Sequence, residues 1–373
     1  MSIFDKLRAD GLQAMLDGRK EGLKVIGAYC TFFPQELAIA AGAVPVSLCG
    51  TKEDPIAAAE EHLPRNLCPL IKSSYGFAIT DTCPYFVLSD LIVGETTCDG
   101  KKKMFELMQE KKPVHVMQLP PTQEGKETLE LWAAEIRRLK ERIEEEFQVT
   151  ISNDDIREAI RLVNDERQAI KDLLDTNKEN PPLIPNVELI KASWSSMFAV
   201  DKQDGIKAAQ ELIAQMRQEK ADAAPTDRPR VLVTGCPIGL GSEKVVKIIE
   251  ELGADMVAME NCTGYKTLEL QADPDHEDPI MALAEKYIKI PCSCMSPNPG
   301  RLDLLRRMIA DFKVDAVIDL TWQACHTYNI EAYSVGQMVK DLGLPYLQLE
   351  TDYSNSDVET LKVRIEALLE MTR

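Results

Sequence analysis

The stretch from Leu67 to Lys103, LCPLIKSSYGFAITDTCPYFVLSDLIVGETTCDGKKK, contains the pattern on which the rest of the chain is built. Its run DLIVGE is short and apolar, which is typical of a parallel strand buried on both faces, and Cys98 follows just beyond that run. Ligands of open α/β sheets bind at the carboxyl ends of the strands, where helix N-termini direct free N–H groups into the crevice. Such a position stabilises a thiolate, so we expect Cys98 to lie at a functional site.

The order strand, cysteine, helix, second strand, cysteine occurs in two separate parts of the chain. It is found in Val25–Cys49, where Cys30 follows the first strand, and again in Val231–Cys262, where Cys236 does so. Repeated strand–helix–strand units predict an α/β fold with two similar doubly wound parallel-sheet domains of the Rossmann or flavodoxin type.

A helical segment is expected to connect the two domains. Residues from about 123 to 180 are highly charged and have helical periodicity, with Ser152 as the expected N-cap of one helix. A length of 373 residues also favours two domains. We therefore predict an N-terminal α/β cluster-binding domain in 1–122, a helical connecting segment in 123–226 and a C-terminal α/β cluster-binding domain in 227–373.

Charge and hydropathy exclude several classes of protein. The formal net charge of −18 argues against a nucleic-acid surface, because phosphate binding needs clustered Lys and Arg. No run approaches the roughly 18 consecutive apolar residues that a membrane span requires. The N-terminal residues alternate apolar and charged side chains, as in an amphipathic helix and unlike a signal peptide. We expect a cytoplasmic protein that binds neither nucleic acid nor membrane.

Ten cysteines are present, and a reducing cytoplasm would keep them from forming disulfides. Cysteines that merely fill a core would be scattered along strands and helix faces. Here six of them lie at or just beyond the carboxyl ends of expected strands: Cys30, Cys49, Cys98, Cys236, Cys262 and Cys325. If the two domains face each other across a cleft, these strand ends converge there, which predicts a shared metal site.

The type of ligand indicates the metal. Only four histidines are present, which disfavours imidazole-rich zinc or iron sites. Structural zinc usually has paired CxxC motifs, and this chain contains only the CSC of residues 292–294. A site made of dispersed single thiolates is typical of an iron–sulfur cluster. The number of thiols exceeds what one cubane needs, so the chain has enough ligands for two.

Several motifs also resemble a known family. GAYCTFFPQELAIAAGAVPVSLC, NLCPLIKSSYG, GETTCDGKKKM, TGCPIG, ENCTG, CSCMSPN, QACHTYN and ETDYS together are similar to the D-component of 2-hydroxyacyl-CoA dehydratases, over nearly the whole chain and in the same order. The cysteine-rich version resembles the double-cubane cluster protein branch of this family. The resemblance implies a [4Fe-4S] cluster held by Cys68, Cys98 and Cys325.

Resemblance to the double-cubane branch implies a second cubane, joined to the first by a bridging sulfide in an [8Fe-9S] cluster and held by three more thiols. The sequence leaves open which three these are. Cys292 and Cys294 point to opposite sides if their loop is extended, so that one of the two would ligate. We rank five cysteines above Cys49 and Cys83 as further ligands: Cys30, Cys236, Cys262, Cys292 and Cys294.

Other residues are candidates for catalysis or cofactor binding. His326 and Tyr328 follow Cys325 and would either transfer protons to a substrate or hydrogen-bond to cluster sulfur. Glu36 is a further catalytic candidate, although stabilisation of its helix N-terminus is the favoured interpretation. Gly235 and Gly239 belong to the loop GCPIGLGSEK, which would form a phosphate-type cradle but lacks a Walker A motif.

We therefore predict an iron–sulfur oxidoreductase that reduces a small-molecule substrate at low potential. The resemblance implies a homodimer and a separate ATP-dependent activator that carries its own [4Fe-4S] cluster. The run Lys101–Lys103 is interpreted as a solvated helix face or as a docking site for this electron donor.

Two alternatives remain open on the sequence. One is a lyase, a subunit of a 2-hydroxyacyl-CoA dehydratase with a single [4Fe-4S] cluster, which eliminates water through a ketyl radical. The other is an electron-transfer or cluster scaffold protein without chemistry of its own. The number of cysteines favours the reductase, because a dehydratase subunit needs three ligands and this chain has many more in suitable places.

Overall fold

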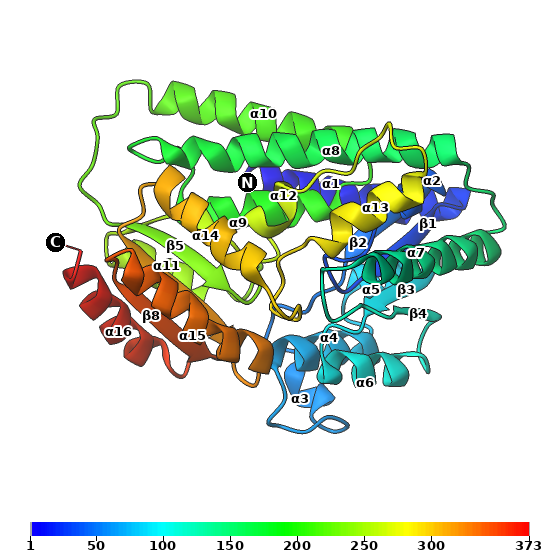
Figure 1. Cartoon of the computed structure of the whole chain (residues 1–373), viewed down its shortest axis with the longest axis horizontal. Coiled ribbons are helices and arrows are strands. Elements are labelled where there is room, and N and C mark those ends of the chain that lie inside the picture. Colours follow the sequence, from blue (N-terminus) through cyan, green and yellow to red (C-terminus); the bar gives the residue numbers. More distant parts are fainter. Residues whose placement is uncertain (1, 373) are drawn as a thin grey trace.

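The computed structural model describes residues 2–372 and contains two four-stranded sheets whose strands are all parallel (Figure 1). The strand orders are β2-β1-β3-β4 and β6-β5-β7-β8, so the second sheet repeats the first strand for strand. This confirms the predicted α/β class with two similar parallel sheets. The strands are β1 (Lys24–Ala28), β2 (Ala43–Ser47), β3 (Leu91–Glu95), β4 (Val114–Met117), β5 (Arg230–Gly235), β6 (Asp255–Met259), β7 (Ala316–Trp322) and β8 (Tyr346–Thr351).

Helices surround both sheets. The N-terminal part contains α1 (Ile3–Gly18), α2 (Gln35–Ala40), α3 (Ile56–Ala59), α4 (Pro69–Thr80), α5 (Pro84–Leu88) and α6 (Asp99–Met108). The middle part contains α7 (Lys126–Phe147), α8 (Asn153–Asp175), α9 (Asn186–Ser195) and α10 (Lys202–Glu219). The C-terminal part contains α11 (Lys244–Glu251), α12 (Tyr265–Leu268), α13 (Pro279–Ile288), α14 (Pro299–Asp311), α15 (His326–Asp341) and α16 (Val358–Glu370). Short 3-10 turns occupy Arg19–Glu21, Thr176–Lys178 and Ser196–Phe198.

Both faces of the first sheet are buried, as the continuous apolar run of β3 predicts. Successive residues of a strand point to opposite faces, and the two faces pack into different apolar clusters. Ile26 packs with Phe32 and Trp132, whereas its neighbour Val25 packs with Tyr29 and Phe105. A sheet covered on both faces can form a site only at the ends of its strands, and ligands of such sheets bind beyond the carboxyl ends.

Each sheet has a topological switch point at its centre. In the first sheet β1 pairs with β2 on one side and with β3 on the other, so the chain reverses its winding direction between these strands. Loops diverge at such a point and leave a crevice beyond the carboxyl ends. Cys30 and Cys98 follow β1 and β3, and Cys236 and Cys325 follow β5 and β7, which are paired in the same way.

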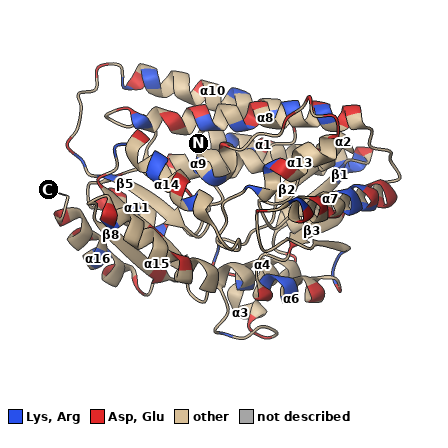
Figure 2. Ribbon diagram, viewed as in Figure 1, with Lys and Arg blue, Asp and Glu red and all other residues tan. Residues whose placement is uncertain are grey.

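Among the middle helices, α8 and α10 pack against each other and run along both sheets, whereas α7 packs against α13 (Figure 1). The predicted cap at the start of α8 is confirmed as a capping box, because Ser152 and Asp155 exchange side-chain and backbone hydrogen bonds. Lys, Arg, Asp and Glu alternate along these helices (Figure 2), which fits a charged layer stabilised by many local ion pairs.

One segment of the C-terminal part packs against the N-terminal sheet. Helix α13 lies against α7 and α8, and its Leu283 shares an apolar cluster with Phe32 and Trp132. The following residues, through Cys292 and Met295, belong to the same cluster. The loop after α13 therefore carries cysteines of the second half to the carboxyl edge of the first sheet.

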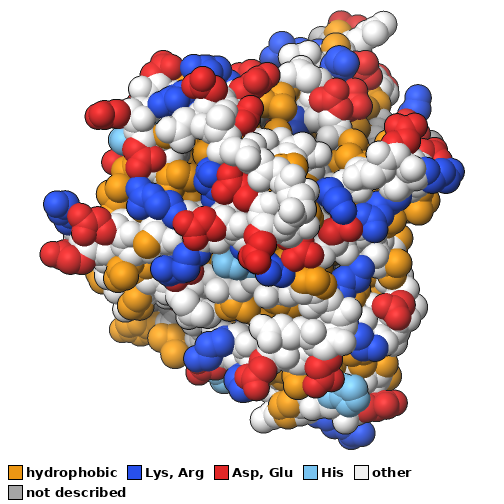
Figure 3. Space-filling view, turned by 90° about the vertical axis from the view of Figure 1, so that its right-hand side faces the viewer, with side chains coloured by type: hydrophobic (Ala, Val, Ile, Leu, Met, Phe, Trp, Pro, Cys, Tyr) orange, Lys and Arg blue, Asp and Glu red, His pale blue; other side chains and the backbone are white. Residues whose placement is uncertain are grey.

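The predicted boundaries at residues 122 and 226 remain predictions. Within residues 2–372, none of the helices combines the length and apolar character that a membrane crossing requires. Acidic and basic side chains are interspersed over the face shown in Figure 3, without a continuous patch of one sign there.

Candidate metal centre

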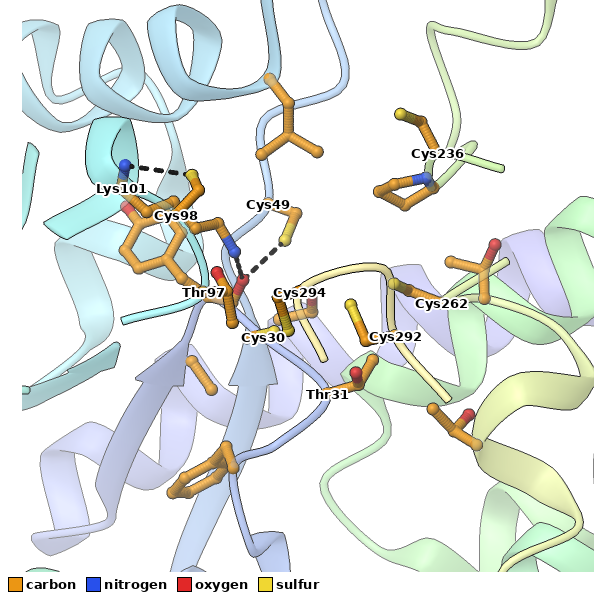
Figure 4. Close-up of a pocket in the computed structure, with 18 of the residues that line it drawn as sticks. Cys30, Thr31, Cys49, Thr97, Cys98, Lys101, Cys236, Cys262, Cys292 and Cys294 are labelled. Carbon is orange, nitrogen blue, oxygen red and sulfur yellow. Dashed lines mark hydrogen bonds between the residues drawn. The ribbon is translucent and has the colours of Figure 1, made fainter. Parts of the chain in front are cut away.

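A single cavity of about 640 Å³ lies where the carboxyl ends of both sheets meet, and it collects most of the thiols (Figure 4). All ten cysteines are free. Nine of them line this cavity: Cys30, Cys49, Cys68, Cys98, Cys236, Cys262, Cys292, Cys294 and Cys325. All eight cysteines proposed as ligands from the sequence are thus brought together, although their role as ligands stays a prediction.

Three of these thiols occupy the N-cap position of a helix of ten or more residues. Cys68 precedes α4, Cys98 precedes α6 and Cys325 precedes α15. The Cys98 sulfur accepts a hydrogen bond from the backbone N–H of Lys101 at 3.4 Å. Helix N-termini carry partial positive charge and free N–H groups, which act in favour of a thiolate at all three positions. At Cys98 burial outweighs this effect and raises the pKa of the thiol. Cys68, Cys98 and Cys325 are the three cysteines that the family resemblance assigns to one cubane.

The first thiol group consists of Cys68, Cys98, Cys236 and Cys325. Hydrogen bonds from Cys236 and then Cys68 lower the pKa of Cys325 to about 3, whereas the same contacts and burial raise the pKa values of those two partners. The Cys236 sulfur also accepts a hydrogen bond from the backbone N–H of Trp322 at 3.3 Å. Cys68 and Cys98 belong to the N-terminal half of the chain, and Cys236 and Cys325 belong to the C-terminal half.

The second thiol group consists of Cys30, Cys262, Cys292 and Cys294, which Figure 4 shows close to one another. A hydrogen bond from Cys294 lowers the pKa of Cys292 to about 6, and Lys266 acts in the same direction. Burial raises the pKa of Cys262 to about 11. The loop after α13 thus places two thiols next to one that follows β1 and one that follows β6.

The two cysteines ranked lowest from the sequence differ from each other in the structure. Cys49 lines the cavity, where its thiol donates a hydrogen bond to the carbonyl of Tyr29 at 3.1 Å. Cys83 is absent from the residues that line the cavity and precedes the short helix α5. Cys83 therefore offers an internal control for experiments on the other thiols.

Two buried lysines near the thiols were missed by the sequence reasoning. Lys101 is only 8% exposed, and its ammonium donates to the carbonyl of Tyr29 at 2.6 Å (Figure 4), so it does not belong to a solvated face as interpreted from KKKM. Lys266 is 1% exposed, pairs with Glu260 at 3.3 Å and donates to the hydroxyl of Tyr328. Both lysines place positive charge beside thiols that must become anions to bind metal.

Glu95 at the end of β3 is fully buried next to Lys101. Neither carboxyl oxygen has a hydrogen-bond partner within the described part of the chain. Burial raises its pKa to about 8, although Lys101 pulls in the opposite direction. The only signal in the sequence was an acidic residue closing an otherwise apolar strand.

The candidates for proton transfer lie at different depths. His326 is exposed at the edge of the cavity, whereas Tyr328 is 5% exposed and lines it from within. Burial holds the pKa of the Tyr328 hydroxyl well above its ordinary value, so it remains protonated. The Tyr328 hydroxyl accepts a hydrogen bond from Lys266, which in turn pairs with the buried Glu260.

Glu36 lies in the first turn of α2 but is absent from the residues that line the cavity. It is fully buried, pairs with Arg167 at 2.9 Å and accepts a hydrogen bond from the hydroxyl of Tyr287 at 2.7 Å. Burial would raise its pKa, but Arg167 and Lys286 hold that pKa below the ordinary value. The geometry therefore supports a structural ion pair rather than contact with a substrate.

Gly235 and Gly239 do not line the cavity, although Cys236 and Pro237, which lie between them in the same loop, do. Gly235 has a φ of +104°, and a side chain there would collide with the carbonyl of Leu320. The N–H of Gly239 donates to the Ser242 hydroxyl at 3.0 Å. Its donor is thus used within the loop, and the predicted phosphate cradle gains no support from this geometry.

The residues present fit a cluster better than a single ion. Within residues 2–372, no three His, Cys, Asp or Glu side chains gather closely enough to hold one metal ion. Thiols distributed around a cavity of this volume instead suit a larger inorganic group with several iron atoms, held by several thiolates.

Fold and site together define a two-sheet α/β protein with a thiol-lined cavity between the sheets. Residues 30–372 match the family 2-hydroxyglutaryl-CoA dehydratase, D-component, and the chain belongs to that family. Membership implies an iron–sulfur cofactor in general terms, without fixing the type of cluster.

Named relatives are dehydratase subunits. The chain is 48% identical to "Putative dehydratase subunit YjiM" of Escherichia coli (strain K12), over 99% of this chain and 96% of that protein. It is 26% identical to the (R)-phenyllactyl-CoA dehydratase beta subunit of Clostridium sporogenes, over 94% of this chain and 92% of that protein. It is 21% identical to the beta subunit of (R)-2-hydroxyglutaryl-CoA dehydratase of Acidaminococcus fermentans, over 98% of this chain and 97% of that protein. These names agree better with the dehydratase alternative than with a reductase.

Replacement of Glu95 by Gln is expected to flatten the pH dependence of stability. A carboxyl whose pKa rises on folding stabilises the folded state fully below its unfolded pKa, and that contribution is lost as pH rises toward about 8. Between pH 5 and pH 8 the unmodified chain should therefore lose about 3 kcal/mol of unfolding free energy more than E95Q does. Urea unfolding at both pH values measures the difference. The exposed Glu106 on α6 provides the control variant E106Q, and equal losses in E95Q and E106Q would contradict the assignment.

Proposed function

We propose that this chain holds an iron–sulfur centre in the thiol-lined cavity and uses it to reduce a small molecule at low potential. The observation that carries the proposal is the presence of nine thiols around one cavity. When bound, such a centre supplies single electrons at low potential. The protein supplies thiolates, buried positive charge at Lys101 and Lys266, and a protonated hydroxyl at Tyr328.

The arrangement of the thiols favours an [8Fe-9S] double cubane. One [4Fe-4S] cubane needs three or four thiolates, and either thiol group alone contains four. The first group contains the cysteines that the family resemblance assigns to one cubane. The second group, delivered in part by the loop after α13, is the source of the three further ligands.

A dehydratase subunit with a single [4Fe-4S] cluster is the second candidate, and the names of the relatives favour it. In that case the second thiol group would line the substrate space without binding iron. A substrate of this class is an acyl thioester, and the part of the cavity not occupied by a cluster would have to accommodate it.

Iron and acid-labile sulfide analysis of the anaerobically purified chain separates these candidates. We expect close to eight irons and nine sulfides per chain, because both thiol groups would be used. About four of each would instead identify the single-cubane dehydratase subunit. Zinc without sulfide would contradict both.

Single substitutions test which thiols hold iron. Cys98→Ser and Cys325→Ser should each remove at least half of the iron, because a neutral hydroxyl replaces a thiolate ligand. Cys83→Ser is the matched control and should keep the full iron content, since Cys83 lies outside the cavity lining. Cys49→Ser is also expected to keep nearly all of it. If C83S lost as much iron as C98S, the loss would reflect a disturbed fold and not the removal of a ligand.

Protein partners form part of the proposal. Two relatives are beta subunits by name, which supports association of this chain with another polypeptide or with a second copy of itself. Helix α15, whose N-cap is Cys325, leaves Ile330 and Tyr333 about three quarters exposed. Large apolar side chains exposed this close to the cavity are suited to an interface.

The donor is proposed to be a separate ATP-hydrolysing activator that carries a [4Fe-4S] cluster. Reduction of the purified chain, followed by electron paramagnetic resonance, should be complete only with donor, activator and ATP together. Docking should weaken with ionic strength if Lys102 and Lys103, which are exposed on α6, guide it. Equal reduction by a strong chemical donor without ATP would show that the gating is absent.

A further inference from the structure

Part of the cavity wall contains no thiol and is instead lined by charged side chains. Glu166 and Arg167 reach it from α8, Lys202 from the start of α10, and Lys286 and Tyr287 from α13. We call these five residues the charged wall. All five are at most 5% exposed, so their charges must be balanced within the protein.

Two of the three cations in the charged wall have carboxylate partners. Arg167 pairs with Glu36 at 2.9 Å and donates to the Tyr287 hydroxyl at 2.8 Å. Lys202 pairs with Glu166 at 3.2 Å. Two buried carboxylates are thereby matched to two buried cations.

Lys286 is the cation left over. Its side chain is 4% exposed, and among residues 2–372 its ammonium has neither a hydrogen-bond acceptor nor an ion-pair partner. The ammonium lies 3.6 Å from the centre of the Tyr287 ring. The hydroxyl of Tyr287 accepts a hydrogen bond from Arg167 and donates one to Glu36. Burial and the neighbouring Arg167 keep the pKa of Lys286 well below the ordinary value, and Glu36 offsets this only in part.

Burying an amine without a hydrogen-bond or ion-pair partner costs free energy, and a ligand in the cavity that supplies such a partner would remove this cost. With Lys286 protonated, the charged wall and Glu36 together carry three cations and two carboxylates. The surplus of one positive charge matches one carboxylate better than a phosphate dianion. We propose that Lys286 binds a carboxylate group of a small-molecule ligand, so that the substrate of this cavity, or an acid derived from it, is a carboxylate. This inference rests on the proposed function only in taking the cavity as the substrate site.

The test compares propionate with propionamide, which have similar size and differ in charge. Calorimetric titration of the purified full-length chain should show propionate binding at least tenfold tighter than propionamide. In Lys286→Met the preference should disappear, because the amine is replaced by an apolar side chain of similar length. Lys286→Gln is a second neutral variant, and thermal unfolding checks that both are folded. The exposed Lys289, at the end of the same helix, provides the control K289M, which should behave like the unmodified chain.

Proton uptake on ligand binding distinguishes a lysine that binds the ligand from one with a purely structural role, because substitution of a structural lysine would leave this uptake unchanged. A bound carboxylate raises the pKa of the amine again, so binding should take up protons, seen as a different heat in phosphate and in Tris buffer. This uptake should be present in K289M and absent in K286M and K286Q. The inference is wrong if the unmodified chain does not prefer propionate, or if the preference and the proton uptake persist without the amine. Iron analysis of the same samples reports on the proposed function separately, because the propionate comparison does not depend on the iron content.

Discussion

A thiol must become an anion to bind metal, and here nine thiols share one largely buried space. Negative charge gathered away from water is tolerated only if positive charge or N–H groups are placed against it. The structure provides both: three thiols sit at helix N-termini, and Lys101 and Lys266 are buried beside the others. Much of the surrounding architecture can be understood as the means of holding these groups in place.

The doubled sheet explains how thiols far apart in the sequence come together. Each sheet opens a crevice at its own switch point, and the cysteines after β1, β3, β5 and β7 lie at these two crevices. Two sheets alone would still leave the second thiol group incomplete. The packing of α13 on α7 and α8 adds Cys292 and Cys294 from a loop rather than from a strand end. The helical layer therefore has a direct role in assembling the site.

Most of the fold could be predicted from local patterns. The buried strand DLIVGE, the strands of the two repeats, their parallel order and the cap at Ser152 were expected, because each depends on residues close together in sequence. The convergence of the cysteines was expected from a rule of parallel sheets that needs no knowledge of side-chain contacts.

The buried charges could not be predicted in this way. Lys101 stands in a run of three lysines, and nothing local distinguishes it from its exposed neighbours 102 and 103. Its burial depends on the position of the Tyr29 carbonyl, 72 residues earlier in the chain. Glu36 was correctly placed in a first helical turn, but its partner Arg167 comes from the helical layer. Pairings over such distances are set by tertiary packing.

The cavity thus has two chemically different parts that suit different tasks. The thiol groups offer soft anionic ligands that suit iron and sulfide, whereas the charged wall offers fixed charges and hydrogen-bond donors that suit an organic molecule. Side chains held by ion pairs in a buried wall change position little, so a ligand there would be oriented without further loss of conformational freedom. A substrate held against the charged wall would share one enclosed space with the thiols, and the Tyr328 hydroxyl lines that same space. This division of the cavity would allow one site to fix a substrate, supply a proton donor and hold a metal centre without any of the three competing for the same side chains.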